Sequence, residues 1–237
     1  MTKDKFIEEL SKLGIVLDLE KLNKLDKFYQ LLNQWNEKIN LTTITKEEDV
    51  YLKHFYDSLT LTKIIDLTKD LTILDVGTGA GFPGIVLKIV FPNLKITLLD
   101  SLNKRINYLN EIIKELDLDN IETICSRCED YTRLNREKYD LVVARAVSHL
   151  EILSEIIMPT VKVDGYFVAM KSNINDEIEK SKHILTKLNS SLVQVLEFKL
   201  PIENSVRTLI KIKKNSLTNV KYPRKYADIK KNHCKNK

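Results

Sequence analysis

Glycine is concentrated at one point of this sequence, directly behind an apolar run. The stretch ILDVGTGAGFPG, residues 73–84, has glycine at 77, 79, 81 and 84, and its apolar run ends in Asp75. The whole chain has only six glycines and five prolines, so the cluster meets a local requirement. Glycine permits a tight turn and lets the backbone approach a ligand without an intervening Cβ. A strand, a glycine turn and a helix form the place where doubly wound folds bind a nucleotide-like ligand.

The spacing of the glycines narrows the choice of ligand. Dinucleotide-binding turns have the pattern G-x-G-x-x-G, with the pyrophosphate at the helix N-terminus. Phe82 stands where that pattern needs glycine, and Phe82 followed by Pro83 would crowd a pyrophosphate. A phosphate-binding P-loop is excluded because no Gly-Lys-Ser/Thr follows the glycines. The turn is therefore expected to bind a ligand without phosphate.

The pattern D-V-G-T-G-A-G resembles the first motif of Rossmann-like S-adenosylmethionine methyltransferases. Their cofactor has an amino-acid end, a ribose and an adenine, so we predict S-adenosylmethionine, with Gly77 and Gly79 at the turn. Asp100, 23 residues after Gly77, ends the next apolar run and is expected to accept both ribose hydroxyls. Glu129, just past the third run, is expected near the adenine. Asp75 and Asp100 could each simply cap a turn or helix, but their placement at consecutive strand ends favours binding.

Strand-like and helical segments alternate from residue 71 onward, which is typical of a parallel sheet with helices on both faces. The last two strand-like runs are separated by only about five residues, so we expect an antiparallel pair at the end. The predicted fold is α/β: a Rossmann-like class I S-adenosylmethionine-dependent methyltransferase, with a mostly parallel seven-stranded sheet, an antiparallel last strand and an N-terminal helical extension. The predicted strands are residues 71–76, 95–100, 121–125, 139–145, 165–171, 191–201 and 205–214. The predicted helices between them are 84–91, 103–116 and 148–161.

Three regions follow from this pattern: an N-terminal helical extension (1–66), a methyltransferase core (67–213) and a basic C-terminal tail (214–237). In the extension, apolar residues recur at helical spacing up to Trp35, and WNEKINLTTI then breaks the period. Trp35 is expected in the helical core. Asn36 and Asn40 are harder to explain by packing, so we place them beside a substrate pocket.

Charge is distributed unevenly along the chain. Residues 211–237 contain ten Lys or Arg against Asp228 alone, a formal charge of +9, whereas the whole chain carries +5. A basic tail on a slightly acidic body indicates either a nucleic-acid contact or a solvated end in a lysine-rich protein. No apolar stretch approaches 18 residues and the N-terminus does not resemble a signal peptide, so we expect a cytoplasmic protein without a membrane span.

Cysteine and histidine do not form a recognisable metal or catalytic set. Cys125 and Cys128 have the spacing of a redox or zinc pair, but there is no second pair and we expect no helix to begin there. The four histidines are not spaced as ligands. We therefore predict no metal site.

Several longer stretches are similar, in the same order, to the RsmG family, also called glucose-inhibited division protein B. They are WNEKINLTTI, HFYDSL, LDVGTGAGFPGIVLKI, TLLDSLNKRINYL, SRCED, YDLVVARAV and YPRK. The resemblance as a whole covers about residues 20 to 225. The resemblance implies methylation of N7 of a guanine in 16S ribosomal RNA, on free RNA or a small ribosomal subunit, by an enzyme we expect to be monomeric. It also implies cofactor contacts at Gly77, Phe82, Cys128, Glu129 and Arg145. The family more often has Ala at the position of Cys128, and the tail YADIKKNHCKNK departs from its usual ending.

The implied chemistry needs no general base, because guanine N7 has a free lone pair and no proton. We therefore assign no catalytic acid or base and expect catalysis by positioning N7 in line with the methyl group. Arginine can stack on bases or bind phosphate in a bidentate way. The predicted RNA-binding residues are Arg127, Arg145, Lys171, Arg207, Arg224 and Lys225. Two alternatives remain. One is a methyltransferase for a small molecule or protein, and the basic tail argues against it. The other is a non-catalytic RNA-binding protein, and the intact glycine turn argues against it.

Overall fold

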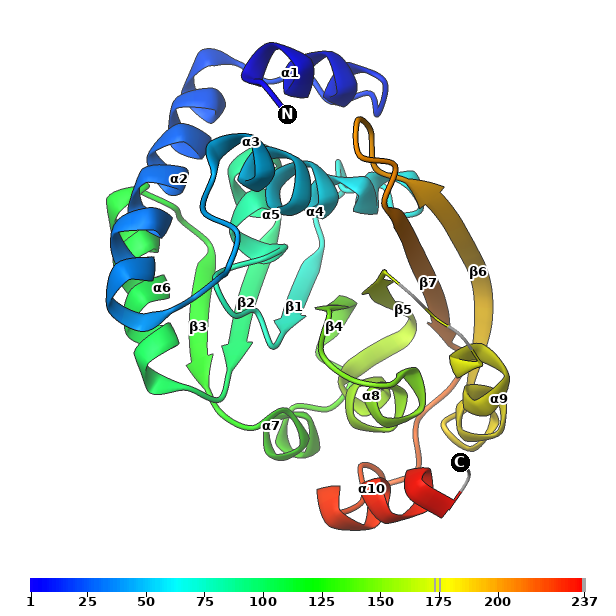
Figure 1. The fold of residues 1–237 in the computed structure, drawn as a ribbon. Coiled ribbons are helices and arrows are strands. Elements are labelled where there is room, and N and C mark those ends of the chain that lie inside the picture. The colour runs from blue at the N-terminus through cyan, green and yellow to red at the C-terminus, as the bar shows by residue number, and fades with distance from the viewer. Residues whose placement is uncertain (173, 175, 236–237) are drawn as a thin grey trace.

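The strands of the structure lie where the apolar runs predict them. The computed structural model describes residues 1–172, 174 and 176–235, which form a twisted sheet with helices on both faces (Figure 1). Its order is β3-β2-β1-β4-β5-β7-β6, and β7 is antiparallel to both neighbours while the other pairs are parallel. The strands are β1 (Thr72–Val76), β2 (Lys95–Asp100), β3 (Ile121–Cys125), β4 (Tyr139–Arg145), β5 (Val161–Lys171), β6 (Ser190–Lys199) and β7 (Val206–Lys214). The predicted fold class is confirmed.

The central strands are buried along nearly their whole length because both of their faces are covered. In β1 and β2 every residue but the first is buried, as is typical of a parallel sheet between two helical layers. The register pairs Val76 with both Leu99 and Ala144. The carboxyl ends of β1, β2 and β4 therefore meet at one edge of the sheet, where open α/β folds bind their ligands.

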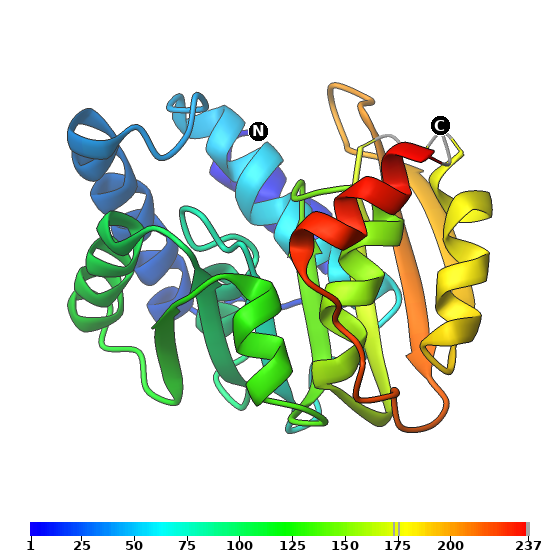
Figure 2. The same ribbon diagram turned by 90° about the horizontal axis from the view of Figure 1, so that it is seen from below.

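Helices cover the two faces as separate layers (Figures 1 and 2). On one face α2 packs on α5 and α6; on the other α8 contacts α7, α9 and α10. The helices of the first layer are α2 (Leu19–Ile39), α5 (Gly84–Val90) and α6 (Asn103–Glu115). Those of the second are α7 (Cys128–Leu134), α8 (Leu150–Ile157) with the 3-10 turn Met158–Thr160, α9 (Glu177–Lys187) and α10 (Tyr226–Lys235). No helix among the described residues has the length and apolar character needed to span a membrane.

The N-terminal extension packs onto the glycine turn through aromatic rings. Phe28 of α2 lies 5.6 Å from Phe55 and 5.4 Å from Phe82, measured between ring centroids. Phe55 belongs to one helical segment whose middle is a π-helix. Its parts are α3 (Glu47–Val50), the π-helix Tyr51–Tyr56, α4 (Asp57–Leu59) and the 3-10 turn Thr60–Lys63, and α1 (Lys3–Ser11) precedes α2. A π-helix at this position turns successive side chains toward the core, and such segments are frequent at functional sites.

Three features near the second layer differ from the sequence analysis. A helix does begin at Cys128, so the expectation of none was wrong. Helices α9 and α10 were not predicted. In the tail, Ile229 of α10 is buried against Ile152 and Ile156 of α8, so this part of the tail is a packed amphipathic helix.

The stretch after α2 is built by its polar residues. The Asn36 carboxamide oxygen accepts hydrogen bonds from Leu41 N (2.7 Å) and Thr42 N (2.8 Å). Asn40 ends α2 in the left-handed conformation with φ of 47°, which asparagine tolerates better than most residues. Trp35 packs against Tyr108, as expected of a core residue. The two asparagines shape the connection, and neither lines the two pockets described below.

Candidate active site

The glycine turn lies across the carboxyl ends of β1 and β2. Gly77 N and Thr78 N both donate to Leu99 O, at 2.8 and 3.1 Å. Gly77 has φ of +66°, a conformation that L side chains rarely adopt, and a Cβ there would lie 3.2 Å from Val147. At Gly84 a Cβ would lie 2.3 Å from Leu98, so glycine is required for α5 to approach β2. The turn is thus a close-packed support that leaves backbone open at the sheet edge.

Asp75 caps this turn from below. Its Oδ2 accepts from Thr78 Oγ1 (2.7 Å) and from Gly84 N (2.8 Å). Its Oδ1 is buried and has no partner among the described residues. Burial raises the pKa of Asp75 to about 6, despite these two hydrogen bonds. Asp75 therefore supports the binding turn and does not itself line a pocket.

Asp75→Asn is expected to change stability in a pH-dependent way. Because the pKa of Asp75 is higher in the folded protein, about 6, than its ordinary 3.8, folding takes up a proton between these values. The stability this provides is present below pH 3.8 and is lost as the pH rises through about 6, a change of about 3 kcal/mol. Asparagine has no such dependence. The variant should therefore lose stability relative to the wild type as the pH is lowered from 7 to 4. The difference between their unfolding free energies, variant minus wild type, should fall by about 3 kcal/mol. Urea denaturation at several pH values measures it, and a pH-independent difference would contradict the assignment.

A pocket of about 350 Å³ opens above the turn, between the ends of β1, β2 and β4 and the start of α7. Asp100 lies in its wall with a nearly buried side chain. Asp100 Oδ2 accepts from Gly79 N (3.1 Å) and Arg105 Nη1 (3.0 Å), and its Oδ1 accepts from Leu102 N (3.0 Å). The lining residues are Val76, Gly77, Leu99, Asp100, Ser101, Arg105, Ser126, Cys128, Arg145, Ala146 and Val147. Among the predicted cofactor residues, Gly77, Asp100, Cys128 and Arg145 thus come together here.

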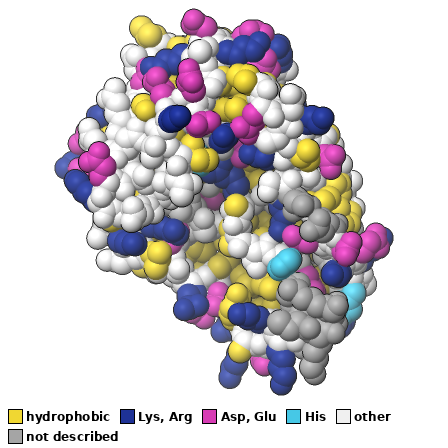
Figure 3. Space-filling view, in the orientation of Figure 1, with side chains coloured by type: hydrophobic (Ala, Val, Ile, Leu, Met, Phe, Trp, Pro, Cys, Tyr) yellow, Lys and Arg dark blue, Asp and Glu magenta, His cyan; other side chains and the backbone are white. Residues whose placement is uncertain are grey.

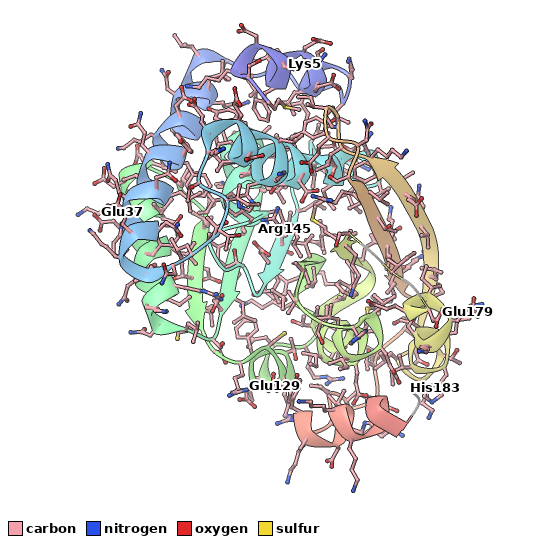
Figure 4. All side chains as sticks on the ribbon, viewed as in Figure 1. Lys5, Glu37, Glu129, Arg145, Glu179 and His183 are labelled. Carbon is pink, nitrogen blue, oxygen red and sulfur yellow. The ribbon has the colours of Figure 1, made fainter. Side chains whose placement is uncertain are left out.

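The first turn of α7 forms another wall of this pocket. Cys128 is its first residue and Glu129 its second; Figure 4 labels Glu129 on this helix. The Cys128 side chain packs near Ile152, Ile156 and Ile229, and burial raises the pKa of its thiol well above the ordinary value. This holds the thiol in its protonated form, which is a poor nucleophile. No group of three His, Cys, Asp or Glu side chains in the described part of the chain could hold a metal ion.

A second pocket of about 250 Å³ adjoins the first, and Arg145 and Ala146 line both. Arg145 lies near the centre of the molecule in Figure 4, and the space-filling view shows this face hollowed there (Figure 3). The second pocket joins residues of the N-terminal extension to the ends of β4, β5 and β7. Its lining residues are Ile44, Lys53, His54, Asp57, Arg145, Ala146, Met170, Lys171, Ser172, Arg207, Thr208 and Leu209.

Arg145 is held between the pockets by the helical segment 47–63. Its Nη1 donates to Lys53 O and to Asp57 Oδ2, both at 3.1 Å, and its Nη2 donates to His54 Nδ1 at 3.2 Å. The guanidinium lies 5.1 Å from the ring centroid of Phe82, which is a cation–π arrangement. Phe82 is buried beneath it and does not line the first pocket. The predicted contact of Phe82 with a cofactor stays a prediction.

His54 is neutral in this environment. Burial first, and the charge of Arg145 second, lower the pKa of His54 to about 3. A guanidinium only donates, so Nδ1 accepts and Nε2 carries the proton, which it donates to Thr42 Oγ1 at 3.0 Å. The ring also stacks on Phe82 at 4.4 Å between centroids. Both nitrogens are engaged, so His54 has no lone pair to offer as a general base.

Asp57 joins Arg145 to a second predicted arginine. Its Oδ2 accepts from Arg145 Nη1, and its Oδ1 accepts from Arg207 Nε at 3.1 Å. The sequence analysis did not single out His54 or Asp57. Their spacing of three residues in a helical stretch could have shown that they share one face.

The four remaining predicted RNA-binding residues differ in whether their side chains already bond to other groups of the protein. Lys171 lines the second pocket, but its Nζ donates to Ser148 O and pairs with Glu177, both at 2.6 Å. Arg224 binds the buried Glu155 through Nε (2.8 Å) and Nη2 (2.6 Å). Arg127 and Lys225 are exposed. Lys171 and Arg224 thus have structural partners, and RNA contact by all four residues stays a prediction.

Comparison with known proteins gives consistent matches. A family model described as rRNA small subunit methyltransferase G (GidB) matches residues 21–206. The chain is 47% identical over 220 residues to the ribosomal RNA small subunit methyltransferase G of Staphylococcus saprophyticus, covering 92% of each chain. It is 48% identical over 232 residues to the protein of the same name from Acetivibrio thermocellus, covering 95% of this chain and 94% of that one. A SAM-dependent methyltransferase structure from Aquifex aeolicus matches with a TM-score of 0.53 and 21% identity, over 70% of this chain and 93% of that one, a likeness of fold alone.

Proposed function

Because this chain belongs to the rRNA small subunit methyltransferase G (GidB) family, as its motifs predict, we propose that the two joined pockets transfer a methyl group to N7 of a guanine in 16S ribosomal RNA. The chain is an S-adenosylmethionine-dependent methyltransferase of small-subunit ribosomal RNA by family and fold. One observation supports the proposal that methyl transfer takes place where the two pockets join. The pocket at the glycine turn and the pocket that holds two arginines share a wall at Arg145 and Ala146.

The first pocket suits S-adenosylmethionine by its chemistry. When bound, this cofactor supplies a methyl group on a positively charged sulfur. The pocket offers open backbone at Gly77 and the carboxylate of Asp100, with Glu129 next to Cys128 on α7, which suit the hydroxyl and amino donors of a ligand without phosphate. Asp100 already accepts three hydrogen bonds and a carboxylate has about four acceptor sites, so one site remains for a ribose hydroxyl. Gly77, Gly79, Asp100, Cys128, Glu129 and Arg145 are the residues we propose to hold the cofactor.

The second pocket is proposed to receive the guanine. In A-form RNA the N7 edge lies in a deep, narrow groove, so the base must be in a loop or be extruded. Methylation of N7 requires no proton acceptor, and this pocket offers none that is free among its groups. His54 is neutral with both nitrogens engaged, and Asp57 is bonded to two arginines. Catalysis then consists of holding N7 in line with the methyl group.

The three regions divide this work. We propose that 1–66 supplies the base pocket through Lys53, His54 and Asp57, that 67–213 binds the cofactor, and that 214–237 contacts RNA. Figure 3 shows Lys and Arg side chains gathered at the lower edge, where α10 lies in Figure 1. Both pockets are built from one chain, which supports action as a monomer, and the chemistry calls for no metal. Ribosomal RNA as substrate supports a place in the cytoplasm.

Arg224→Ala and Lys225→Ala are expected to separate a structural from an RNA-binding role in the tail. Arg224→Ala leaves Glu155, which is 1% exposed, without its partner, so the unfolding free energy should fall by roughly 2 kcal/mol. Lys225→Ala should leave stability within about 0.5 kcal/mol but reduce the salt dependence of RNA binding by about one ion. Chemical denaturation and RNA titration at several salt concentrations measure the two effects. The reverse pattern would place the RNA contact on Arg224.

The proposed function is tested with methyl-labelled S-adenosylmethionine and small ribosomal subunits that lack the modification. The RNA is digested and its nucleosides are separated by mass. Labelled 7-methylguanosine is the expected product. Label on another nucleoside, or no label on RNA, would leave the fold standing and overturn the proposal.

A further inference from the structure

Asp57 is the point where three parts of the fold meet. It begins α4 of the N-terminal extension, and each of its oxygens accepts a hydrogen bond from a different arginine at 3.1 Å. Arg145 ends β4 and Arg207 lies at the start of β7. These strands are not neighbours in the sheet, so Asp57 fixes the distance between two guanidinium groups that nothing else in the described chain joins directly.

Each arginine keeps donors that the described part of the chain does not use. Arg145 uses both hydrogens of Nη1 and one of Nη2, which leaves Nε and one Nη2 hydrogen. Arg207 uses Nε for Asp57 and Nη1 for Ser205 Oγ and Val206 O, and its Nη2 has no partner in the part of the chain that the structure describes. Since both residues line the second pocket, these donors are available to a bound nucleotide.

The charges of the pocket depend on Asp57 as well. Lys171 is paired with Glu177, and Lys53 is paired with Asp49 and Glu203. Two arginines and one carboxylate leave the centre of the pocket with a net positive charge, which suits the carbonyl oxygen of a guanine or an RNA phosphate. Without the carboxylate, two guanidinium groups would repel each other and Arg207 would lose its only ion-pair partner among the described residues.

We infer that Asp57 is a positioning residue for methyl transfer: it holds Arg145 and Arg207 as a pair with fixed spacing that grips the guanine nucleotide, and it acts through them. The inference rests on the proposed function. His54 assists by accepting the Nη2 hydrogen of Arg145, which fixes the rotation of that guanidinium over Phe82. We assign Asp57 no bond of its own to the base; each of its oxygens accepts from an arginine that lines the pocket.

Asp57→Asn tests the inference. An amide keeps the size of the side chain but presents an N–H to one of the arginines, so the pair loses its spacing. We expect kcat on small ribosomal subunits to fall about tenfold or more, because small misplacements are costly in a reaction that depends on positioning. Binding of S-adenosylmethionine should stay within about twofold of wild type, because Arg145, the residue through which Asp57 reaches the first pocket, keeps its hydrogen bonds to Lys53 O and His54 Nδ1. Asp140→Asn is the matched control. That carboxylate also bonds several groups, Thr72 and Lys162, but at the opposite edge of the sheet, and its loss should leave kcat unchanged.

A double variant separates positioning from the other roles. If Asp57 acts through Arg207, adding Asp57→Asn to Arg207→Met should cost much less than Asp57→Asn costs alone. Additive losses would mean that Asp57 contacts the substrate itself or only supports the fold, and would overturn the inference. If Asp57→Asn does not fold, His54→Phe carries the test. It keeps a ring on Phe82, removes the acceptor of Arg145, and should lower kcat with unchanged cofactor binding.

The two proposals fail in different ways. If the wild-type protein puts no label on guanine N7, the proposed function is wrong whatever the variants do. If the wild type methylates guanine and Asp57→Asn does so with the wild-type kcat, the function stands and the positioning role is wrong.

Discussion

Gly77→Val is expected to abolish S-adenosylmethionine binding while the chain still folds. At φ of +66° a side chain is strained, and its Cβ would already lie 3.2 Å from Val147, which lines the first pocket. The two further methyl groups of valine would enter the space left open at the turn. We expect the dissociation constant of the cofactor to rise at least about 100-fold, because the valine methyl groups occupy part of the space in which the cofactor is proposed to bind. Isothermal titration calorimetry measures it.

Gly14→Val is the matched control for the strain itself. Gly14 has φ of +73° and a Cβ there would meet nothing within 4 Å, so only the backbone cost is shared with Gly77. Both variants should lose about 1–2 kcal/mol of stability from the left-handed backbone. Only Gly77→Val should lose the cofactor. Normal cofactor binding by that variant would mean that the first pocket is not the cofactor site.

The sheet could be predicted because strands that are buried on both faces are rich in apolar residues. The run LVVA is apolar at every position and ILDV at every position but Asp75, as is typical of strands covered on both faces. The helices of the second layer were harder. The start of α7 at Cys128 has no side-chain cap, and its preceding residue is Arg127. Without Ser, Thr, Asp or Asn at that position, the local signal for a helix start is limited to the acidic residues Glu129 and Asp130 in the first turn.

The candidate site was predictable in its first pocket and less so in its second. The glycines and Asp100 lie close together because consecutive strand ends meet at one edge, which the fold class alone implies. The second pocket depends on contacts between distant parts of the chain. Asp57 meets Arg207 from 150 residues away, and Arg224 meets Glu155 from 69 residues away. Single-sequence patterns carry no information on such partners, which is why Asp57 and the bond between Arg224 and Glu155 were not predicted.

Asparagine shows how the same residue type can mislead. Asn36 and Asn40 were placed beside the substrate pocket because polar residues at the end of an apolar helix suggested function. In the structure both residues shape the backbone instead. Asn36 accepts hydrogen bonds from two backbone amides, and Asn40 ends α2 with a positive φ. Their influence on the site is indirect. The connection they shape carries Thr42, which accepts the hydrogen of His54.

Arg145→Met is expected to abolish most methyl transfer while leaving much of the cofactor binding intact. The guanidinium makes its three hydrogen bonds to the N-terminal extension, on the side of the second pocket, whereas the first pocket also receives the neighbouring residues 146 and 147. Methionine fills similar space but cannot donate. We expect kcat on small ribosomal subunits to fall at least about 100-fold, and more than in Asp57→Asn, because the residue shared by both pockets is lost. The cofactor dissociation constant should rise less than about tenfold.

A matched control separates this loss from a general loss of stability. Arg136 is also largely buried and donates to Tyr222 O and Thr218 O, but it lines neither pocket. Arg136→Met should cost stability comparable to Arg145→Met, about 2 kcal/mol, without lowering kcat. A second readout comes from His54. Its pKa of about 3 is lowered by burial first and by Arg145 second, so it should rise in Arg145→Met yet stay below 6.5, which imidazole NMR signals can follow. An unchanged kcat together with a raised His54 pKa would show that the guanidinium lies where the structure places it and has no part in methyl transfer.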